Sequence, residues 1–217
     1  MARRLDIAQI NISGILVLIL LGALIAAAAI DPPSANRVPK ITAEDRRVTA
    51  IHESGHAVLA ANLPAGGAIV EITIESSWGI LGSVTRAPAA DSLGAAERRA
   101  RKMAELIIAQ GGLIAEQIIL NSDDPSDEPS DEPSDSMTSD IIAAEKIAFE
   151  LLGGPDANLA PGEIDAGVRR LMDAAERRAR DILDARKDAL LRLAAALLDS
   201  GTLSGGQVSV ILASGNE

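Results

Sequence analysis

The chain has 217 residues, enough for one domain of ordinary size and an appendage. Apolar residues make up 47% of it, which allows a hydrophobic core and excludes global disorder. Cysteine is absent, and this excludes disulfides, thiolate catalysis and cysteine-ligated metal sites. The net charge is −11 and the aromatic residues number only one Trp and one Phe, so no nucleic-acid partner is expected.

An uncharged apolar run from Ile10 to Ile30 stands near the start of the chain. A helix needs about 20 such residues to cross a bilayer core. A cleaved signal peptide is the alternative, but its apolar segment is normally shorter, so we predict a single-pass transmembrane anchor over residues 1–31. Basic residues are more numerous after the run (Arg37, Lys40, Arg46, Arg47) than before it (Arg3, Arg4), which favours a cytoplasmic location for the following domain.

The remainder is expected to form a linker over residues 32–41 and one domain over residues 42–217. Thr42 is a typical helix N-cap, and it predicts a helix from Ala43 to Asn62. Two short strands at about 68–74 and 82–85 predict a hairpin or small sheet. Further helices are expected at about 93–110, after Gly111-Gly112 to Leu120, at 138–152, and within 164–200, where a bend near Asp188 is compatible with the sequence. The predicted fold class is therefore mainly α, with a small β-sheet or hairpin.

Residues 121–137 read NSDDPSDEPSDEPSDSM, an acidic low-complexity tract with a four-residue period. A prolyl-acidic repeat cannot bury apolar area. We therefore expect a solvated loop that acts as a spacer.

The two histidines of the chain lie four residues apart, in the sequence His52-Glu53-Ser54-Gly55-His56. This H-E-x-x-H spacing on a helix places both imidazoles on one face, within reach of one metal ion. Glu53 is then placed to act as the general base toward a metal-activated water. Two structural histidines on a helix are the alternative, which the position of the glutamate disfavours.

A catalytic zinc site usually has three protein ligands, so two histidines leave one ligand to be found. With no further His and no Cys, the third ligand is expected to be a carboxylate. The candidates are Glu116, Asp140, Glu145 and Glu150, and composition alone does not choose among them.

Four segments together resemble the peptidase domain of the FtsH-type membrane zinc metalloproteases. Arg47–Val58 resembles the family's active-site helix, and 70–74 followed by 79–82 is similar to its strand and Leu-Gly turn. The segment 111–116 is similar to the family's Gly-Gly-Arg-x-Ala-Glu segment, with Leu113 in place of the arginine. The segment 136–141 stands where the family has the aspartate that is its third zinc ligand.

This resemblance implies Zn²⁺ as the cofactor, with His52, His56 and Asp140 as its ligands and Glu53 as the catalytic residue. It implies a structural or supporting role for Glu116. The family's ATPase domain precedes its peptidase domain, whereas no G-x-x-x-x-G-K-[ST] loop occurs in these residues.

The expected function is that of a membrane-anchored zinc metalloendopeptidase, ATP-independent as a lone chain, which cleaves unfolded or flexible protein segments. Its expected partners are protein or peptide substrates and a membrane, with a homo-oligomer and a separate ATPase partner both compatible with the sequence. We expect the strand Ile69–Ile74 to pair with an extended substrate. The alternative function is a catalytically impaired, peptidase-like adaptor or regulator at the membrane.

Overall fold

The computed structural model of the chain describes residues 41–77, 80–88, 93–120 and 135–214. The chain divides into two compact units, Met1–Ile41 and Thr42–Glu217, and all elements named below belong to the second unit. The apolar run 10–30 lies outside the described residues. Within the described ranges, no helix combines the length and the apolar character that crossing a bilayer requires.

The second unit is mainly helical, with a small antiparallel sheet, as the sequence predicts. Its helices are α2 (Ala43–Asn62), α3 (Ala95–Ala109), α4 (Gly111–Ile119), α5 (Asp135–Leu151), α6 (Pro161–Ala185), α7 (Lys187–Ser200) and α8 (Gly205–Ala213), with a 3₁₀ turn at Gly154–Asp156. Its strands are β1 (Ile69–Ser77), β2 (Ile80–Arg86) and β3 (Thr202–Ser204).

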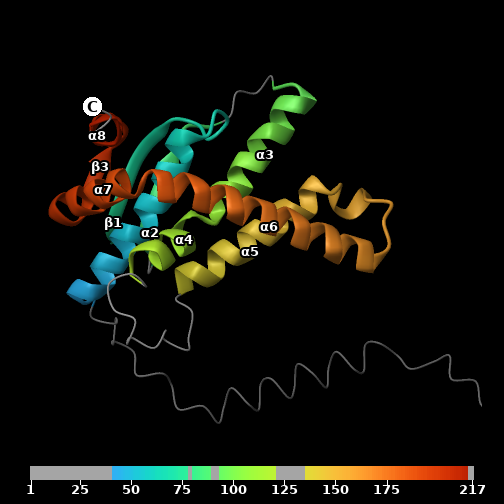
Figure 1. Cartoon of the computed structure of the whole chain (residues 1–217), viewed down its shortest axis with the longest axis horizontal. Helices are drawn as coiled ribbons and strands as arrows, with labels where there is room; N and C mark the ends of the chain where they lie inside the picture. The colour runs from blue at the N-terminus through green and yellow to red at the C-terminus, as the bar shows by residue number, and fades with distance from the viewer. Residues whose placement is uncertain (1–40, 78–79, 89–92, 121–134, 215–217) are drawn as a thin grey trace, which may run out of the picture. The chain divides into compact units, whose positions relative to one another are not determined.

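Helix α2 lies at the centre of this unit. A capping box at Thr42 and Asp45 fixes its start, and every residue from Thr49 to Ala60 is buried. A helix that is buried all round requires packing partners on several sides. The sheet, α7 and α8 lie on one side of α2, whereas α3, α5 and most of α6 lie on the other, with α4 packed along it (Figure 1).

The sheet has the strand order β2-β1-β3, and both pairings are antiparallel. Ile72 of β1 pairs with Val84 of β2 on one side and with Leu203 of β3 on the other. Strand β1 is therefore central, and the expectation that it pairs with substrate is wrong, because both of its edges are already occupied. Among the described strands, the edge that remains unpaired near the H-E-x-x-H motif of α2 is that of β2, and it is called the free edge below.

One hydrophobic core joins the sheet to the helices. Ile72 and Ile74 of β1 are fully buried in the same cluster as Leu59 of α2 and Leu193 and Leu197 of α7. The motif-bearing helix is thus held by packing on both flanks, which gives the site a rigid base.

Several boundaries differ by a few residues from the expected ones, among them those of β1, β2, α5 and α6. Helix α5 begins at Asp135, inside the tract 121–137 expected to be a loop. The last proline of that tract is Pro133, so the backbone beyond it is free to become helical. The long C-terminal stretch divides at Arg186, close to the expected bend, where the backbone leaves helical geometry with φ −118° and ψ 20°.

Candidate metal centre

His52 and His56 project from α2 one turn apart and meet at their Nε2 atoms. These two nitrogens are 3.1 Å apart, and the ring centroids are 4.8 Å apart. Both residues are buried. The spacing of four residues has therefore placed both imidazoles at one point, as the sequence predicts.

The other nitrogen of each ring has an acceptor of its own. Nδ1 of His56 donates to the carbonyl of Ile108 at 2.7 Å, and Nδ1 of His52 lies 2.6 Å from Oε1 of Glu116. A carbonyl or an ionised carboxylate can only accept, so the proton of each neutral imidazole lies on Nδ1. In that tautomer each Nε2 carries no proton, and its lone pair is free to bind a metal ion.

Asp140 of α5 completes this group. Its Oδ2 atom lies 3.0 Å from Nε2 of His52 and 2.9 Å from Nε2 of His56. This oxygen is buried and has no hydrogen-bond donor among the described residues. Three acceptor atoms thus form a triangle with sides near the roughly 3.3 Å that separates two ligands of a tetrahedral zinc ion. The donor set of two imidazoles and one carboxylate fits a metal ion.

The charged groups around the three ligand atoms also favour a bound metal cation. Burial lowers the pKa of His52, but Asp140, Glu116 and Glu53 together raise this pKa to about 10. Burial raises the pKa of Asp140, but His52 and His56 outweigh burial and hold it well below its usual range. The surroundings therefore stabilise a positive charge where the three side chains meet.

The four carboxylates considered for the third ligand are placed differently from one another. Asp140 reaches both histidines, whereas Glu116 lies on the far side of His52 and contacts only Nδ1. Glu145 is exposed on α5 and Glu150 forms an ion pair with Lys102. The geometry thus separates a residue that faces the centre from one that orients a histidine.

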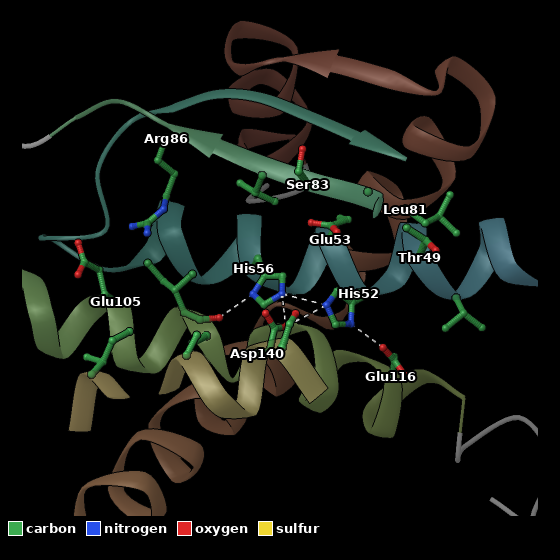
Figure 2. Close-up of a pocket in the computed structure, with 18 of the residues that line it drawn as sticks. Thr49, His52, Glu53, His56, Leu81, Ser83, Arg86, Glu105, Glu116 and Asp140 are labelled. Atoms are coloured by element: carbon green, nitrogen blue, oxygen red, sulfur yellow. Dashed lines mark hydrogen bonds and ion pairs between the residues drawn. The ribbon is translucent and has the colours of Figure 1, made fainter. Parts of the chain in front are cut away.

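Glu53 lies beside the histidines and points toward β2 (Figure 2). Its side chain fits because Gly82 of β2 has no Cβ, which would lie 2.5 Å from Oε1 of Glu53. Gly82 also has a φ of +83°, a conformation that favours glycine. Burial is the main cause that raises the pKa of Glu53, whereas His56 and His52 lower it and Asp140 raises it.

Close packing of α4 against α2 holds the histidines. A Cβ at Gly112 would collide with the imidazole of His52, and a Cβ at Gly55 would collide with the carbonyl of Gly111. The Gly-Gly pair therefore lets the two helix backbones approach, and this approach brings Glu116 to His52.

A cleft of about 800 Å³ opens over this centre, between β2 on one side and α3 and α5 on the other (Figure 2). Besides the predicted residues it is lined by side chains that sequence reasoning did not single out, among them Thr49, Ser83, Arg86 and Glu105. Thr49 lies on α2 one turn before Glu53, so the helix period could have placed it beside the motif. Nothing in the local sequence marks Ser83, Arg86 and Glu105, because only the pairing of β2 and the position of α3 bring them to the cleft.

A mainly helical domain with an H-E-x-x-H helix and a facing carboxylate defines a metal-dependent hydrolase class. Residues 39–149 match the family model described as peptidase family M41, and the chain belongs to this family.

Several ATP-dependent zinc metalloproteases are similar to this chain. FtsH of Neorickettsia risticii is 33% identical over 182 residues, which cover 78% of this chain and 28% of that protein. FtsH of Akkermansia muciniphila is 31% identical over 192 residues, which cover 79% and 23%. FTSH 11, chloroplastic/mitochondrial, of Arabidopsis thaliana is 29% identical over 186 residues, which cover 79% and 22%. The chain thus spans about a quarter of the length of these relatives.

The resemblance to the FtsH-type peptidase domain is therefore confirmed. The expected Zn²⁺ cofactor is supported by two independent findings, the names of these relatives and the grouping of His52, His56 and Asp140.

Proposed function

We propose that this chain is a zinc metalloendopeptidase that hydrolyses peptide bonds in unfolded or flexible protein segments. The observation that carries the proposal is the triangle of Nε2 of His52, Nε2 of His56 and Oδ2 of Asp140, with Glu53 beside it in an open cleft. We assign these three atoms as the zinc ligands and Glu53 as the catalytic base.

A bound Zn²⁺ at this place supplies Lewis-acid polarisation of a carbonyl and lowers the pKa of its water to about 7. The chain's residues do the rest. Glu53 takes a proton from the attacking water and passes it to the leaving amine, because its carboxylate lies in the cleft next to the histidines. Glu116 and the Ile108 carbonyl hold the two imidazoles in the tautomer that leaves Nε2 free for the metal.

Substrate binding is proposed along the free edge of β2. Leu81, Ser83 and Arg86 of this strand line the cleft, so an extended chain added to β2 would lie over the metal centre. Only a segment without its own tertiary structure can supply such an edge, and this is why flexible segments are the proposed substrates.

The setting of the peptidase is part of the same proposal. We assign the apolar run 10–30 as a single-pass membrane anchor, with the peptidase domain on the cytoplasmic side. The relatives named above are ATP-dependent by name, whereas these 217 residues contain no phosphate-binding Gly-Lys-Ser/Thr loop. We propose that flexible chains are cleaved without ATP, because a segment without tertiary structure needs no unfolding before it pairs with β2. Folded substrates would need a separate ATPase to unfold them.

The decisive experiment compares wild type with Glu53→Gln for zinc content and for cleavage of an unstructured fluorogenic peptide. The variant is expected to keep one zinc per chain and to lose activity by a factor of roughly 10² to 10⁴, the usual contribution of a general base. Equal cleavage rates would show that Glu53 is not the base. Stoichiometric zinc without turnover in the wild type would favour the adaptor or regulator instead.

A further inference from the structure

The charges that line the cleft are unevenly distributed. The acidic residues of the lining are Asp45, Glu53, Glu105, Glu116 and Asp140. Arg86 is the single Lys or Arg in the lining formed by the described residues. It lies at the end of the cleft where β2 finishes, far from the end where Thr49 and Glu116 lie (Figure 2).

The guanidinium of Arg86 is held in place but not neutralised. Its Nη1 donates to the Gly66 carbonyl at 2.7 Å, and within residues 41–77, 80–88, 93–120 and 135–214 no carboxylate forms an ion pair with it. A guanidinium has five N–H donors, so most of its donors remain for other partners. Burial lowers the pKa of Arg86, as does the charge of Arg101, whereas Glu105 raises it. An arginine stays charged throughout.

Glu105, the acidic residue at the same end, is engaged elsewhere. Its Oε1 accepts from Nε of Arg101 at 3.2 Å, and Nη2 of Arg101 in turn donates to the Ala87 carbonyl at 3.3 Å. Because Arg101 compensates the charge of Glu105, Arg86 is the uncompensated charge at this end of the cleft among the described residues.

We propose that Arg86 forms a specificity subsite that binds an acidic side chain of the substrate. This inference rests on the proposed function, because it assumes that a peptide lies along β2. A chain paired with β2 passes from the metal centre to Arg86, the last residue of the strand. An antiparallel chain reaches Arg86 with residues on the amino-terminal side of the scissile bond, since β2 runs from Ile80 toward Arg86.

The chemistry favours carboxylates in particular. A planar guanidinium binds a carboxylate through two parallel hydrogen bonds, and the partly buried position weakens screening by solvent. Glutamine has the same shape as glutamate and lacks the charge, so a Glu/Gln pair of substrates isolates the electrostatic contribution. We expect kcat/KM to be about tenfold higher for the Glu peptide, the size of one charge-assisted hydrogen bond in a partly exposed site.

The test uses the zinc-loaded full chain and an unstructured peptide in which one Glu is moved through each position around the scissile bond. Every Glu peptide is paired with its Gln counterpart. One position on a single side of the bond is expected to show the preference, and Arg86→Gln is expected to reduce the Glu/Gln ratio there to about one. Glu105→Gln removes the competing negative charge and should increase the ratio, whereas Arg177→Gln on the exposed face of α6 serves as the matched control.

The two proposals fail in different ways. Cleavage of all peptides with a Glu/Gln ratio near one at every position would overturn the subsite and leave the peptidase standing. If no peptide is cleaved, the affinities of the Glu and Gln peptides are compared by fluorescence anisotropy on zinc-loaded Glu53→Gln. Tighter binding of the Glu peptide that is lost with Arg86→Gln would support the subsite without the peptidase. Equal affinities, or no binding of either peptide, would overturn the subsite.

Discussion

At the scale of single residues, Gly112 controls where the ring of His52 lies. A methyl group at Gly112 would collide with this imidazole, whose Nδ1 is tied to Glu116 at 2.6 Å. The ring would have to rotate away from His56 and Asp140 or the two helices would have to separate. Either change moves a donor atom out of the triangle that fits the metal.

We therefore predict that Gly112→Ala lowers zinc affinity by about 10- to 100-fold, the range found when the support of a ligand is lost. Overpacking should also reduce the free energy of unfolding by about 1–3 kcal/mol. Competition with a chromophoric chelator measures the first effect, and urea unfolding of the metal-free protein measures the second.

Gly162→Ala provides the matched control. Gly162 lies in α6 with no atom within 4 Å of a Cβ built on it. This substitution should leave zinc affinity unchanged and stabilise the helix by up to about 1 kcal/mol. Equal zinc affinities of Gly112→Ala and Gly162→Ala would contradict the role given to Gly112.

Part of the site could be predicted from local spacing and part could not. His52, Glu53 and His56 share one helical turn, so their grouping follows from the period of the helix. Asp140 reaches them through tertiary packing. Residue chemistry alone made it one of four candidates for the third ligand, with Glu116, Glu145 and Glu150, and only the family resemblance singled it out. Arg86 carried no signal, because its place in the cleft depends on how β2 pairs with β1.

At the scale of elements, the start of α2 depends on two reciprocal hydrogen bonds. The Asp45 backbone N–H donates to Oγ1 of Thr42 at 3.0 Å, and the Thr42 backbone N–H donates to Oδ2 of Asp45 at 2.7 Å. The backbone and side-chain hydrogen bonds of Thr42 lower the pKa of Asp45 from its ordinary value of 3.8. The cap fixes the first turn of the helix that carries His52 and His56.

Loss of this cap should destabilise the domain in a pH-dependent way. Thr42→Ala is expected to reduce the free energy of unfolding by about 1 kcal/mol near pH 7. The contribution of the Asp45 carboxylate is fully present above pH 3.8 and is lost as the pH falls through the lower pKa of the folded state. The stability difference between wild type and Asp45→Asn should therefore shrink below pH 4.

Denaturant unfolding of both proteins with metal removed measures that difference, because zinc release would otherwise add its own pH dependence. Glu44→Gln is a useful control, since Glu44 lies in the same first turn and forms an ion pair with Arg47 rather than a cap. A difference between wild type and Asp45→Asn that stays constant from pH 7 to pH 3 would contradict the carboxylate's role in the cap.

Helices and strands could be predicted where their hydrophobic pattern and end signals extend over many residues. Helix α2 has the predicted bounds because the cap at Thr42 and Pro64 mark its two ends. Strand β3 was not foreseen, since three residues are too few for an alternating pattern. Because β3 pairs with β1, β1 is a central strand and has no edge left for a substrate. The proposed substrate strand therefore pairs with β2 instead.

At the scale of the whole second unit, the proposed metal site joins elements that are distant in the sequence. His52 and His56 belong to α2 and Asp140 belongs to α5, and few residues of α5 otherwise approach α2. Helix α5 packs mainly on α3 and α6. A metal bound by all three side chains would therefore tie α5 to the central helix.

Metal removal should accordingly lower the stability of the folded protein as a whole. At a free zinc concentration about 1,000 times the Kd, binding to the native state contributes about 4 kcal/mol. For a domain of this size the Tm should then fall by roughly 10 °C on chelation. Calorimetry with and without chelator measures the shift.

The variant Asp140→Ala should lose most of this zinc-dependent shift in Tm, because α5 no longer supplies a ligand. The control Glu145→Ala, exposed on the same helix, should keep the shift. An undiminished zinc-dependent shift in Asp140→Ala would show that α5 is not tied to α2 through the metal.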